Sequence, residues 1–387
     1  MIEEITLTDF LSFGPGSHTL TLRPLNVLIG PNGSGKSNLV EAFAVLRAVP
    51  KDLPLPIRQG GGVDEWIWRG EQTKRAESAG IEVIFNGNAI AKHPVRYRVA
   101  FGSEGGSFVV TDERIENQTG SPKPLFYFGY ENGQPMLNNA NEAKRALERA
   151  DVDRTQSILS QRRDPESYPE VARAGDRLKE LLIYRAWSFG PQSSIRAACG
   201  ADVQTDRLLE DFSNLPARLA VLKRAPATKK RLLALLSEVA PGFTDVEVVP
   251  EGGQLRLYLT EGDRNVPAQR LSDGTLRYLS LLAILLDPGP VRLVLIEEPE
   301  LGLHPDVLPA LRDLLVEAST RFQLIVTTHS TQLVDAMTEH ADAIVVCEKD
   351  GATSRASRLD AAEVARWKEF GSLGALWLSG RIGGTRW

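Results

Sequence analysis

The feature that most limits what this chain can fold into is a glycine-rich octapeptide near its N-terminus. Residues 30–37 read Gly-Pro-Asn-Gly-Ser-Gly-Lys-Ser, which fits the pattern of a phosphate-binding loop. The loop follows a short apolar run, Leu25–Ile29, and precedes Ser37–Val49, where apolar residues recur at helical spacing. Glycines let backbone N–H groups turn toward a phosphate, and the start of the helix adds partial positive charge. We therefore expect an α/β fold that binds a nucleotide.

The loop contains the first candidate site residues. We expect Lys36 to reach the β- and γ-phosphates, and the hydroxyl of Ser37 to ligate Mg²⁺. ATP and Mg²⁺ are therefore the expected cofactors. The neighbouring positions that we expect to contact the phosphates are Asn32, Gly33, Ser34, Gly35 and Asn38.

A second apolar run ends in two adjacent carboxylates. The segment Val291–Ile296 is followed by Glu297 and Glu298. A buried parallel strand delivers such acids to the carboxyl edge of its sheet, where a phosphate loop also lies. We expect Glu297 to hold Mg²⁺ through water, and Glu298 to orient and deprotonate the attacking water.

Two further motifs precede and follow this acidic pair. The pentapeptide Leu271–Thr275 reads LSDGT and opens a helix whose bare N–H groups can bind an anion, although the pentapeptide alone is more typical of an ordinary capped helix. The apolar run Phe322–Thr328 leads into Thr-Thr-His-Ser. There His329 can donate a hydrogen bond to a γ-phosphate, although a histidine in this position is more often a packed or capping residue.

The order of these motifs resembles a known family. The phosphate loop, LSDGT, LIEEPELGLHP and TTHS together are similar to the ABC-type ATPase heads of the RecF, SMC and OLD-like group, in particular to bacterial AAA "predicted ATPases" that consist of little beyond a head. The resemblance implies a P-loop NTPase fold with a mostly parallel core sheet, an antiparallel β subdomain and a helical signature lobe. It implies one head over 1–387, with its nucleotide-binding core in 1–50 and 265–387, an antiparallel meander and insert in 51–165, and a helical lobe with a hairpin in 166–264.

The resemblance also assigns roles by position. Lys36 joins Glu298, the catalytic base, and His329, the switch histidine, as a catalytic residue. Ser272 and Gly274 form the signature that contacts the γ-phosphate of the partner subunit.

The resemblance suggests two further site residues, and the sequence differs from the usual motifs of the family at two places. Gln192 is the expected glutamine-loop residue and a further Mg²⁺ ligand, and Phe13 or Ser12 is expected to line the adenine. Glu297 stands where the family usually has Asp, which predicts modest activity. LSDGT replaces the LSGGQ of transporters, which suits the RecF side of the superfamily.

Composition excludes several classes of protein. The chain has 387 residues with 45 basic and 50 acidic side chains, so a generally basic nucleic-acid coat protein is excluded, although a local basic groove is not. Its two cysteines cannot form a disulfide framework or a cysteine-based zinc site. The longest apolar stretch, Leu276–Leu286, is interrupted by Arg277 and is too short to cross a membrane. The N-terminus is acidic and alternating, unlike a signal peptide. We expect a cytoplasmic protein with no membrane partner.

These features favour one function over two others. The segment between the phosphate loop and LSDGT is longer than in transporter ATPases and too short for the coiled coil of SMC proteins, and the residues after Asp350 are too few for the Toprim nuclease domain of OLD proteins. The favoured hypothesis is an ATPase that forms a head-to-tail homodimer with shared ATP sites, a switch in DNA repair or antiphage defence that acts on DNA or on a separate nuclease or other effector. The alternatives are an ATPase subunit of a transporter and a nucleotide-binding scaffold with little hydrolysis.

Several weaker patterns complete the sequence analysis. Residues 51–70 are predicted as an ordered loop, alternating runs within 81–130 as an antiparallel meander, and 141–185 as polar helices. Leu208–Leu222 is predicted as a helix, and Val246–Val249 and Gln254–Thr260 as the two strands of a hairpin. His304 near the acidic motif resembles a dimer loop more than a metal cluster, and the tryptophans at 66, 68 and 187 are expected to pack rather than to stack on bases. A basic cluster can contact phosphates but is more often a solvated face. It comprises Lys223, Arg224, Lys229, Lys230 and Arg231.

Overall fold

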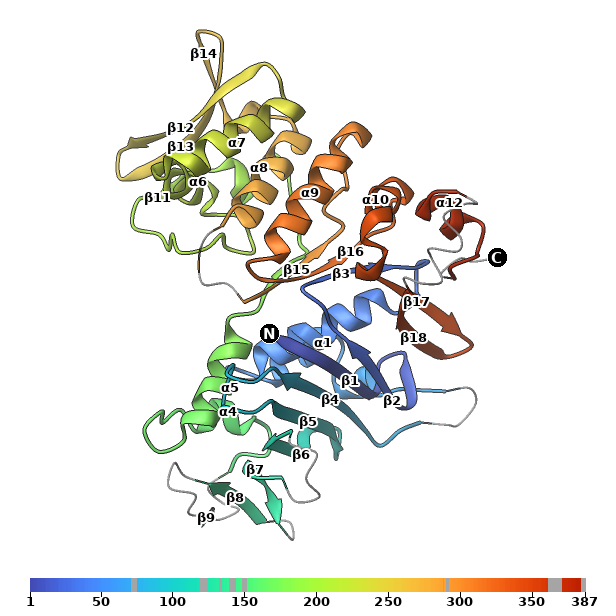
Figure 1. Cartoon of the computed structure of the whole chain (residues 1–387). Coiled ribbons are helices and arrows are strands. Elements are labelled where there is room, and N and C mark those ends of the chain that lie inside the picture. The colour runs from blue at the N-terminus through green and yellow to red at the C-terminus, as the bar shows by residue number, and fades with distance from the viewer. Residues whose placement is uncertain are drawn as a thin grey trace. The chain divides into compact units, whose positions relative to one another are not determined.

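The computed structural model divides the chain into two compact units. The first unit comprises Met1–Leu181, Asp342–Glu363 and Ser379–Trp387, and the second comprises Leu182–Ala341 and Val364–Leu378. Figure 1 shows the course of the chain, coloured from blue at the N-terminus to red at the C-terminus. The residues that the structure describes are 1–70, 75–118, 124–131, 134–138, 144–147, 152–287, 289, 292–360 and 371–383.

The first unit contains an eight-stranded sheet in which neighbouring strands are antiparallel. In its strand β1, Ile5 and Leu7 are buried, whereas Thr6 faces the other way and shares a hydrogen bond with Thr19 at 2.8 Å. This alternation is the pattern of a strand with one face in the core. In spatial order the strands are β2 (Phe13–Thr21), β1 (Ile2–Phe10), β4 (Ser78–Phe85), β5 (Val95–Glu104), β6 (Ser107–Asn117), β7 (Phe126–Glu131), β8 (Gln134–Asn138) and β9 (Lys144–Ala146).

This sheet bears on the predicted fold class, a mostly parallel core sheet with an antiparallel β subdomain. The largest sheet of the chain is antiparallel, and the mostly parallel core stays a prediction. The predicted meander is confirmed, and β1 and β2, which the sequence analysis assigns to the nucleotide-binding core, pair in the same sheet as β4. Alternation identifies a half-buried strand but not its partner, so the sequence could not show this pairing. The domain boundaries at 50, 165 and 264 stay predictions.

The phosphate loop lies in the first unit, between β3 (Leu25–Ile29) and α1 (Lys36–Ala48). All of β3 is buried, and it pairs in parallel with β17 (Ile344–Asp350). The strand β18 (Thr353–Arg358) continues this group antiparallel to β17. Because a fully buried parallel strand reads as a continuous apolar run, the predicted strand, loop and helix are confirmed here.

Short helices differ from the sequence predictions in the rest of the first unit. Residues 51–70 contain two helices rather than only a loop, and proline in the first turn of α2 suits a helix start because its missing N–H has no partner there. Among the described residues of the predicted helical range 141–185, α4 and α5 are helical, whereas β9 and β10 are strands; residues 141–143 and 148–151 lie outside the described part of the chain. The helices are α2 (Pro54–Gln59), α3 (Val63–Trp66), α4 (Ile158–Gln161) and α5 (Pro169–Lys179).

The second unit contains three adjacent parallel strands. In order they are β10 (Leu182–Tyr184), β15 (Leu293–Glu297) and β16 (Gln323–Thr327). Four residues of β15 and all of β16 are buried, as their apolar sequences predict. The helices α8 (Asp273–Leu285), α9 (Leu308–Ser319), α10 (Thr331–Ala336) and α12 (Leu373–Leu378) belong to the same unit.

A second group of elements in this unit combines two helices with a small antiparallel sheet. The predicted hairpin is confirmed, with Val246 opposite Leu259. The helix predicted from Leu208 begins later, at Leu215, because residues 211–214 form a turn in which Phe212 has a φ of 60°. The elements are α6 (Leu215–Arg224), α7 (Pro226–Val239), β11 (Cys199–Gly200), β12 (Phe243–Glu251), β13 (Gln254–Glu261) and β14 (Arg264–Pro267).

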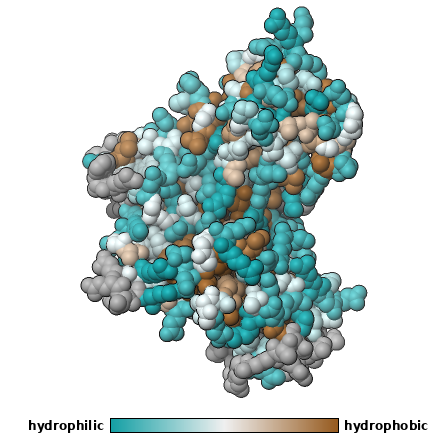
Figure 2. Space-filling model, turned by 180° about the vertical axis from the view of Figure 1, so that it is seen from behind, coloured by the Kyte–Doolittle hydropathy of each residue, from teal (hydrophilic) through white to brown (hydrophobic). Residues whose placement is uncertain are grey.

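The surface is mainly polar. Figure 2 shows hydrophilic residues over most of the face that it draws, with hydrophobic residues scattered among them. Among the described helices, none combines the length and apolarity needed to cross a bilayer. The large apolar side chains that are exposed are Met1, Leu55, Leu125, Val249, Leu301 and Leu378.

Candidate functional site

The phosphate loop has a backbone geometry that requires its glycines. Gly30 and Gly35 have φ angles of 148° and 103°, in the region that favours glycine. A Cβ atom at Gly30 would lie 2.2 Å from the carbonyl oxygen of Cys347, so the loop packs directly on β17. The ammonium of Lys36 donates to the carbonyl oxygens of Gly30 at 2.7 Å and of Pro31 at 3.0 Å. These bonds hold the charge of Lys36 at the loop itself.

The other predicted loop residues divide into exposed and buried positions. Asn32, Gly33 and Ser37 are exposed, so their polar groups are accessible to a ligand. Ser34 is 1% exposed, and its hydroxyl oxygen has no hydrogen-bond partner among the described residues. A buried hydroxyl without a partner is costly, so this oxygen is available for a bond to a bound group.

The turn between β1 and β2 and the start of β2 pack against the phosphate loop and the first turn of α1. The ring of Phe13 is 1% exposed and lies under Gly35. Asn38 donates to the hydroxyl of Ser12 at 2.6 Å, and that hydroxyl shares a 2.7 Å hydrogen bond with Ser354. Phe13 was expected to line the adenine, but a buried ring offers no free face for stacking. Its position is that of a support for the loop.

The second unit brings Glu298 and His329 together. Glu298 follows β15 and His329 follows β16, and the parallel pairing of these strands aligns their ends. His329 Nε2 lies 3.4 Å from Glu298 Oε1, and both side chains are more than one-third exposed. Glu298 has a φ of 47° and donates its N–H to the carbonyl of Thr327 at 3.0 Å. The carboxylate thus stands beside the histidine on a backbone that few non-glycine residues adopt.

Glu297 contacts the segment that follows β10. Its carboxylate lies 3.3 Å from Nε of Arg185, and its carbonyl accepts a hydrogen bond from Nε1 of Trp187 at 2.8 Å. Both the side chain and the peptide of Glu297 are therefore fixed by residues 185–187.

A third carboxylate, that of Glu300, contacts the turn that carries His329. Its Oε1 accepts bonds from the hydroxyl of Thr328 and from the N–H of His329. Burial raises the pKa of the Glu300 carboxyl, partly offset by these bonds. The contacts join the loop after β15 to the turn that carries His329.

The helix α8 begins at the LSDGT motif. The hydroxyl of Ser272 accepts a bond from the N–H of Thr275 at 3.1 Å, so Ser272 caps the helix as the ordinary interpretation predicts. Ser272 is nevertheless exposed. Gly274 packs on the loop after β15, where a Cβ atom would lie 2.9 Å from the carbonyl of Gly302. The side chain of Arg196, only 8% exposed, bonds the carbonyl of Leu271 and the carboxylate of Asp273.

A family model covers most of the chain. The family described as "AAA domain, putative AbiEii toxin, Type IV TA system" matches residues 25–335. The chain belongs to this family. The match includes the phosphate loop, the LSDGT motif, the Glu297–Glu298 pair and His329.

Parts of this chain are similar to parts of two better-known proteins. The DNA replication and repair protein RecF of Renibacterium salmoninarum is 36% identical over 113 residues, which are 26% of this chain and 27% of RecF. The chromosome partition protein Smc of Desulfitobacterium hafniense is 24% identical over 205 residues, 49% of this chain and 17% of Smc. The chain therefore spans about a quarter or less of the length of these relatives.

Solved structures share the fold over nearly the whole chain. An Smc head bound to the C-winged helix domain of ScpA has a TM-score of 0.59 at 16% identity, covering 94% of this chain and 99% of that head. An Smc head with an extended coiled coil, bound to the C-terminal domain of ScpA and derived from Pyrococcus furiosus, has a TM-score of 0.58 at 15% identity, covering 95% and 98%. The predicted resemblance to a RecF- and SMC-like ATPase head is confirmed.

The remaining predicted residues belong neither to the phosphate loop nor to the group around Glu298 and His329. Gln192 lies in an exposed turn of the second unit, and its expected role as a Mg²⁺ ligand stays a prediction. In the basic cluster, Asp245 lies 3.0 Å from Lys223 and 3.3 Å from Lys229, and Glu317 lies 3.4 Å from Arg231. These two acids offset part of the cluster's charge, which favours a solvated face over a strong phosphate-binding site.

The metal-cluster alternative around His304 gains no support. His304 is largely exposed and lies 3.3 Å from Asp306, its neighbour in the short helix 305–307. Within the described part of the chain, no group of three or more histidine, cysteine or acidic side chains is arranged to hold a metal ion.

The residues that hold Glu298 and His329 in place were not predicted from the sequence. Arg277 belongs to no recognised motif, and neither Arg185 nor the motif residues Thr328 and Glu300 were assigned a role in holding Glu298 and His329. Trp187 packs on Phe212 at 4.8 Å between ring centroids, as expected of a packing tryptophan, but it also bonds Glu297. A buried arginine in an apolar helix is the one signal that could have pointed to Arg277.

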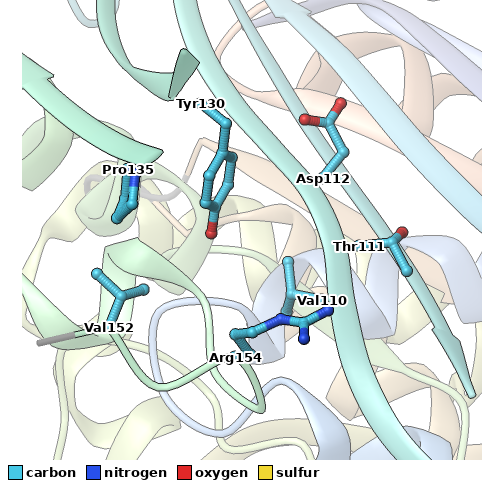
Figure 3. Close-up of a pocket in the computed structure, with 7 residues that line it drawn as sticks. All are labelled: Val110, Thr111, Asp112, Tyr130, Pro135, Val152 and Arg154. Atoms are coloured by element: carbon cyan, nitrogen blue, oxygen red, sulfur yellow. The ribbon is translucent and has the colours of Figure 1, made fainter. Parts of the chain in front are cut away.

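A cavity of about 450 Å³ lies elsewhere, on the antiparallel sheet of the first unit (Figure 3). None of the predicted site residues is among the described residues that line it. Burial raises the pKa of Tyr130 in its wall. The lining residues are Val110, Thr111, Asp112, Tyr130, Pro135, Val152 and Arg154.

Proposed function

We propose that this chain binds ATP with Mg²⁺ at the phosphate loop and hydrolyses it as a head-to-tail homodimer. The phosphate loop carries the proposal, because its glycine backbone, the buried hydroxyl of Ser34 and the ammonium of Lys36 gather donors at the start of α1. Such a loop at a helix N-terminus binds phosphate through oriented N–H groups and a positive partial charge.

Each loop residue then has a defined role. Lys36 exchanges its bonds to Gly30 and Pro31 for bonds to the β- and γ-phosphates. The exposed hydroxyl of Ser37 and the carboxylate of Glu297 are hard oxygen donors that fit Mg²⁺, with Gln192 as a third candidate. The ion neutralises charge on the phosphates when it is bound. Asn32, Gly33, Ser34 and Gly35 contact the phosphates, while Phe13 and Asn38 support the loop.

We assign the hydrolytic step to Glu298 and His329. Glu298 accepts the proton of the attacking water, and His329, 3.4 Å away, donates to the γ-phosphate. Glu300 fixes the turn that carries His329 through the bonds it accepts from Thr328 and His329. Ser272 and Gly274 contact the nucleotide of the partner subunit, because their helix start is a second anion site and the phosphate loop already supplies the first.

Relatives suggest where such a switch works. RecF acts in DNA replication and repair and Smc in chromosome partition, which favours a DNA-related role in the cytoplasm. The family description names a toxin of a toxin–antitoxin system, which favours defence. We propose that the ATP-bound dimer acts on DNA or on a separate nuclease or other effector in one of these settings.

The direct test is phosphate release by the purified protein. Wild type should release phosphate from ATP with Mg²⁺ and not with EDTA, and Lys36→Ala should bind little nucleotide and release none. Binding without turnover by the wild type would instead support the scaffold alternative. No binding by a folded wild type would contradict the proposal.

A further inference from the structure

The backbone of Glu298 is strained and is held by contacts from several sides. Its φ of 47° places a non-glycine residue in a left-handed conformation that is costly and persists only where the surroundings fix it. Its N–H bonds the carbonyl of Thr327, and its own carbonyl accepts from the N–H of Leu301 at 3.2 Å. A third contact comes from the helix α8.

That third contact is the guanidinium of Arg277. Nη1 of Arg277 donates to the carbonyl of Glu298 at 3.0 Å. Arg277 lies in the second turn of α8, the helix that begins at Ser272, and it is 5% exposed. One side chain thus joins the signature helix to the peptide of the proposed catalytic base.

Two aromatic rings fix the guanidinium in place. The central carbon of Arg277 lies 4.5 Å from the ring centroid of Trp187 and 5.1 Å from that of Phe189. Trp187 also bonds the carbonyl of Glu297. The planar guanidinium can stack and donate at the same time, which an ammonium cannot do. The carbonyls of Glu297 and Glu298 are therefore both held by this one arginine–aromatic group.

The start of α8 also touches the loop that follows Glu298. Gly274 packs on the carbonyl of Gly302, so a shift of the helix start displaces this loop directly. Arg277 bonds the same loop one turn further along α8. The signature and the catalytic carboxylate are joined by two contacts at neighbouring turns of one helix.

We propose that Arg277 is a positioning residue. It makes the orientation of Glu298 depend on whether the LSDGT motif contacts a partner's nucleotide. Contact between Ser272 and a partner's nucleotide fixes α8, and Arg277 passes this constraint to the Glu298 peptide. This inference rests on the proposed function, since it assumes that Glu298 faces the attacking water. It predicts that hydrolysis requires the signature helix to be held as well as nucleotide to be bound.

The test compares Arg277→Met with two other variants. Arg277→Met keeps the length and apolar stem of the side chain and removes the donor and charge, whereas Arg277→Lys restores charge and a donor but not the planar stack. Arg321→Met is the matched control, because Arg321 bonds the carbonyl of Leu285 at the far end of α8 and lies 5.9 Å from the ring of Phe322. Thermal unfolding checks that all are folded.

The kinetic readout separates positioning from binding. Arg277→Met should lower kcat by about tenfold to a hundredfold, because small misplacements of a reacting group have effects of this size. Its KM should stay within about twofold of wild type. Arg277→Lys should recover part of the loss, and Arg321→Met should behave like wild type. Unchanged kcat in Arg277→Met overturns the inference, and if that variant fails to fold, unchanged kcat in Arg277→Lys does so.

A second readout does not need hydrolysis. Hydrogen exchange of peptides covering residues 297–303 is measured with and without Mg²⁺ and a non-hydrolysable ATP analogue. Wild type and Arg321→Met should gain protection with the analogue, and Arg277→Met should not. If wild type shows this change but releases no phosphate, hydrolysis fails as a function while the link through Arg277 stands. The same change in Arg277→Met, or none in wild type, overturns the link.

Discussion

Glu298 has a backbone conformation that departs from what its residue type prefers. A glutamate at positive φ is uncommon, and here it ends a buried strand beside His329. Strained residues cluster at sites where function requires a fixed geometry. The observed φ of Glu298 therefore favours the same catalytic role that the motif predicts.

We predict that Glu298→Gln retains ATP binding and slows hydrolysis by roughly a hundredfold or more, because the amide cannot accept the proton of water. ATP should then hold the protein as a dimer. Phosphate release and light scattering with ATP measure both effects. Glu339→Gln, a change outside the motifs on the short helix that follows α10, serves as the control. Phosphate release by Glu298→Gln at the wild-type rate would remove Glu298 from this role.

At the scale of single residues, the sequence predicted the site residues that lie in recognised motifs. Glu298 and His329 follow two apolar runs, and parallel pairing of those runs brings their ends together. The contacts of Arg277 could not be predicted, because its partners come from residues 187–189 and 298, far away in the chain. In the sequence it only interrupts an apolar stretch.

At the scale of elements, a buried carboxylate joins α4 to the antiparallel sheet. Glu113 on β6 is 1% exposed and accepts bonds from the hydroxyl of Tyr97 at 2.8 Å, from Ser157 and from the N–H of Ile158 at 2.8 Å. Ser157 caps α4. Burial raises the pKa of Glu113 to about 7, although the bonds from Ser157, Ile158 and Tyr97 oppose this.

This carboxyl predicts a loss of stability as the pH rises. Its folded-state pKa lies above the ordinary value, so its contribution is complete below the ordinary pKa and is lost as the pH rises toward and through about 7. Glu113→Gln, which resembles the protonated form, should gain on the order of 2–3 kcal/mol relative to wild type between about pH 5 and about pH 8.

Urea unfolding at several pH values measures this difference. Glu104→Gln is the control, since Glu104 is exposed and pairs with Arg154 at 3.1 Å on the surface of the same unit. Its stability relative to wild type should change little with pH. A constant difference between Glu113→Gln and wild type across the range would show that Glu113 titrates normally.

Elements were predictable where burial leaves a simple pattern. Continuous apolar runs identified β3, β15 and β16, and the hairpin of β12 and β13 followed from alternation. The partners of β1 and β2 and the short helices in 51–70 were not predictable. Strand pairing and one-turn helices depend on tertiary contacts, which local periodicity does not contain.

At the scale of the whole molecule, net charge bears on how DNA could be bound. The chain carries a formal charge of −5, and three members of the basic cluster pair with the two carboxylates of Asp245 and Glu317. Contacts with DNA phosphates must therefore be local. Repulsion elsewhere makes them weak unless a dimer combines two such surfaces.

We predict that DNA binding requires ATP and weakens at least about tenfold between about 50 and 200 mM salt, as expected for as few as two phosphate contacts. Titration of labelled duplex, with and without ATP, measures this. Lys230→Glu in the basic cluster tests whether that face takes part. No binding at low salt in the ATP state would favour a protein effector.

The proposed sharing of ATP sites between two chains allows a complementation test. Lys36→Ala should abolish nucleotide binding, and Ser272→Arg should block contact with the partner's γ-phosphate, so each variant alone should be inactive. In a mixed dimer, one site carries both changes and the other carries neither. Random equal mixing makes about half of the dimers mixed, each with one intact site of two, so roughly a quarter of wild-type activity should return if the sites act independently.

The controls decide what a failure of complementation means. Replacing the capping serine also costs helix stability, about 1 kcal/mol, so thermal unfolding of Ser272→Arg must show a folded protein. Differently tagged subunits must be shown to form mixed dimers with ATP. If they form and no activity returns, independent shared sites are excluded, and coupling between the two sites through α8 becomes the alternative to test. If Ser272→Arg alone hydrolyses ATP normally, the LSDGT motif is only a capped helix, because no partner nucleotide depends on it.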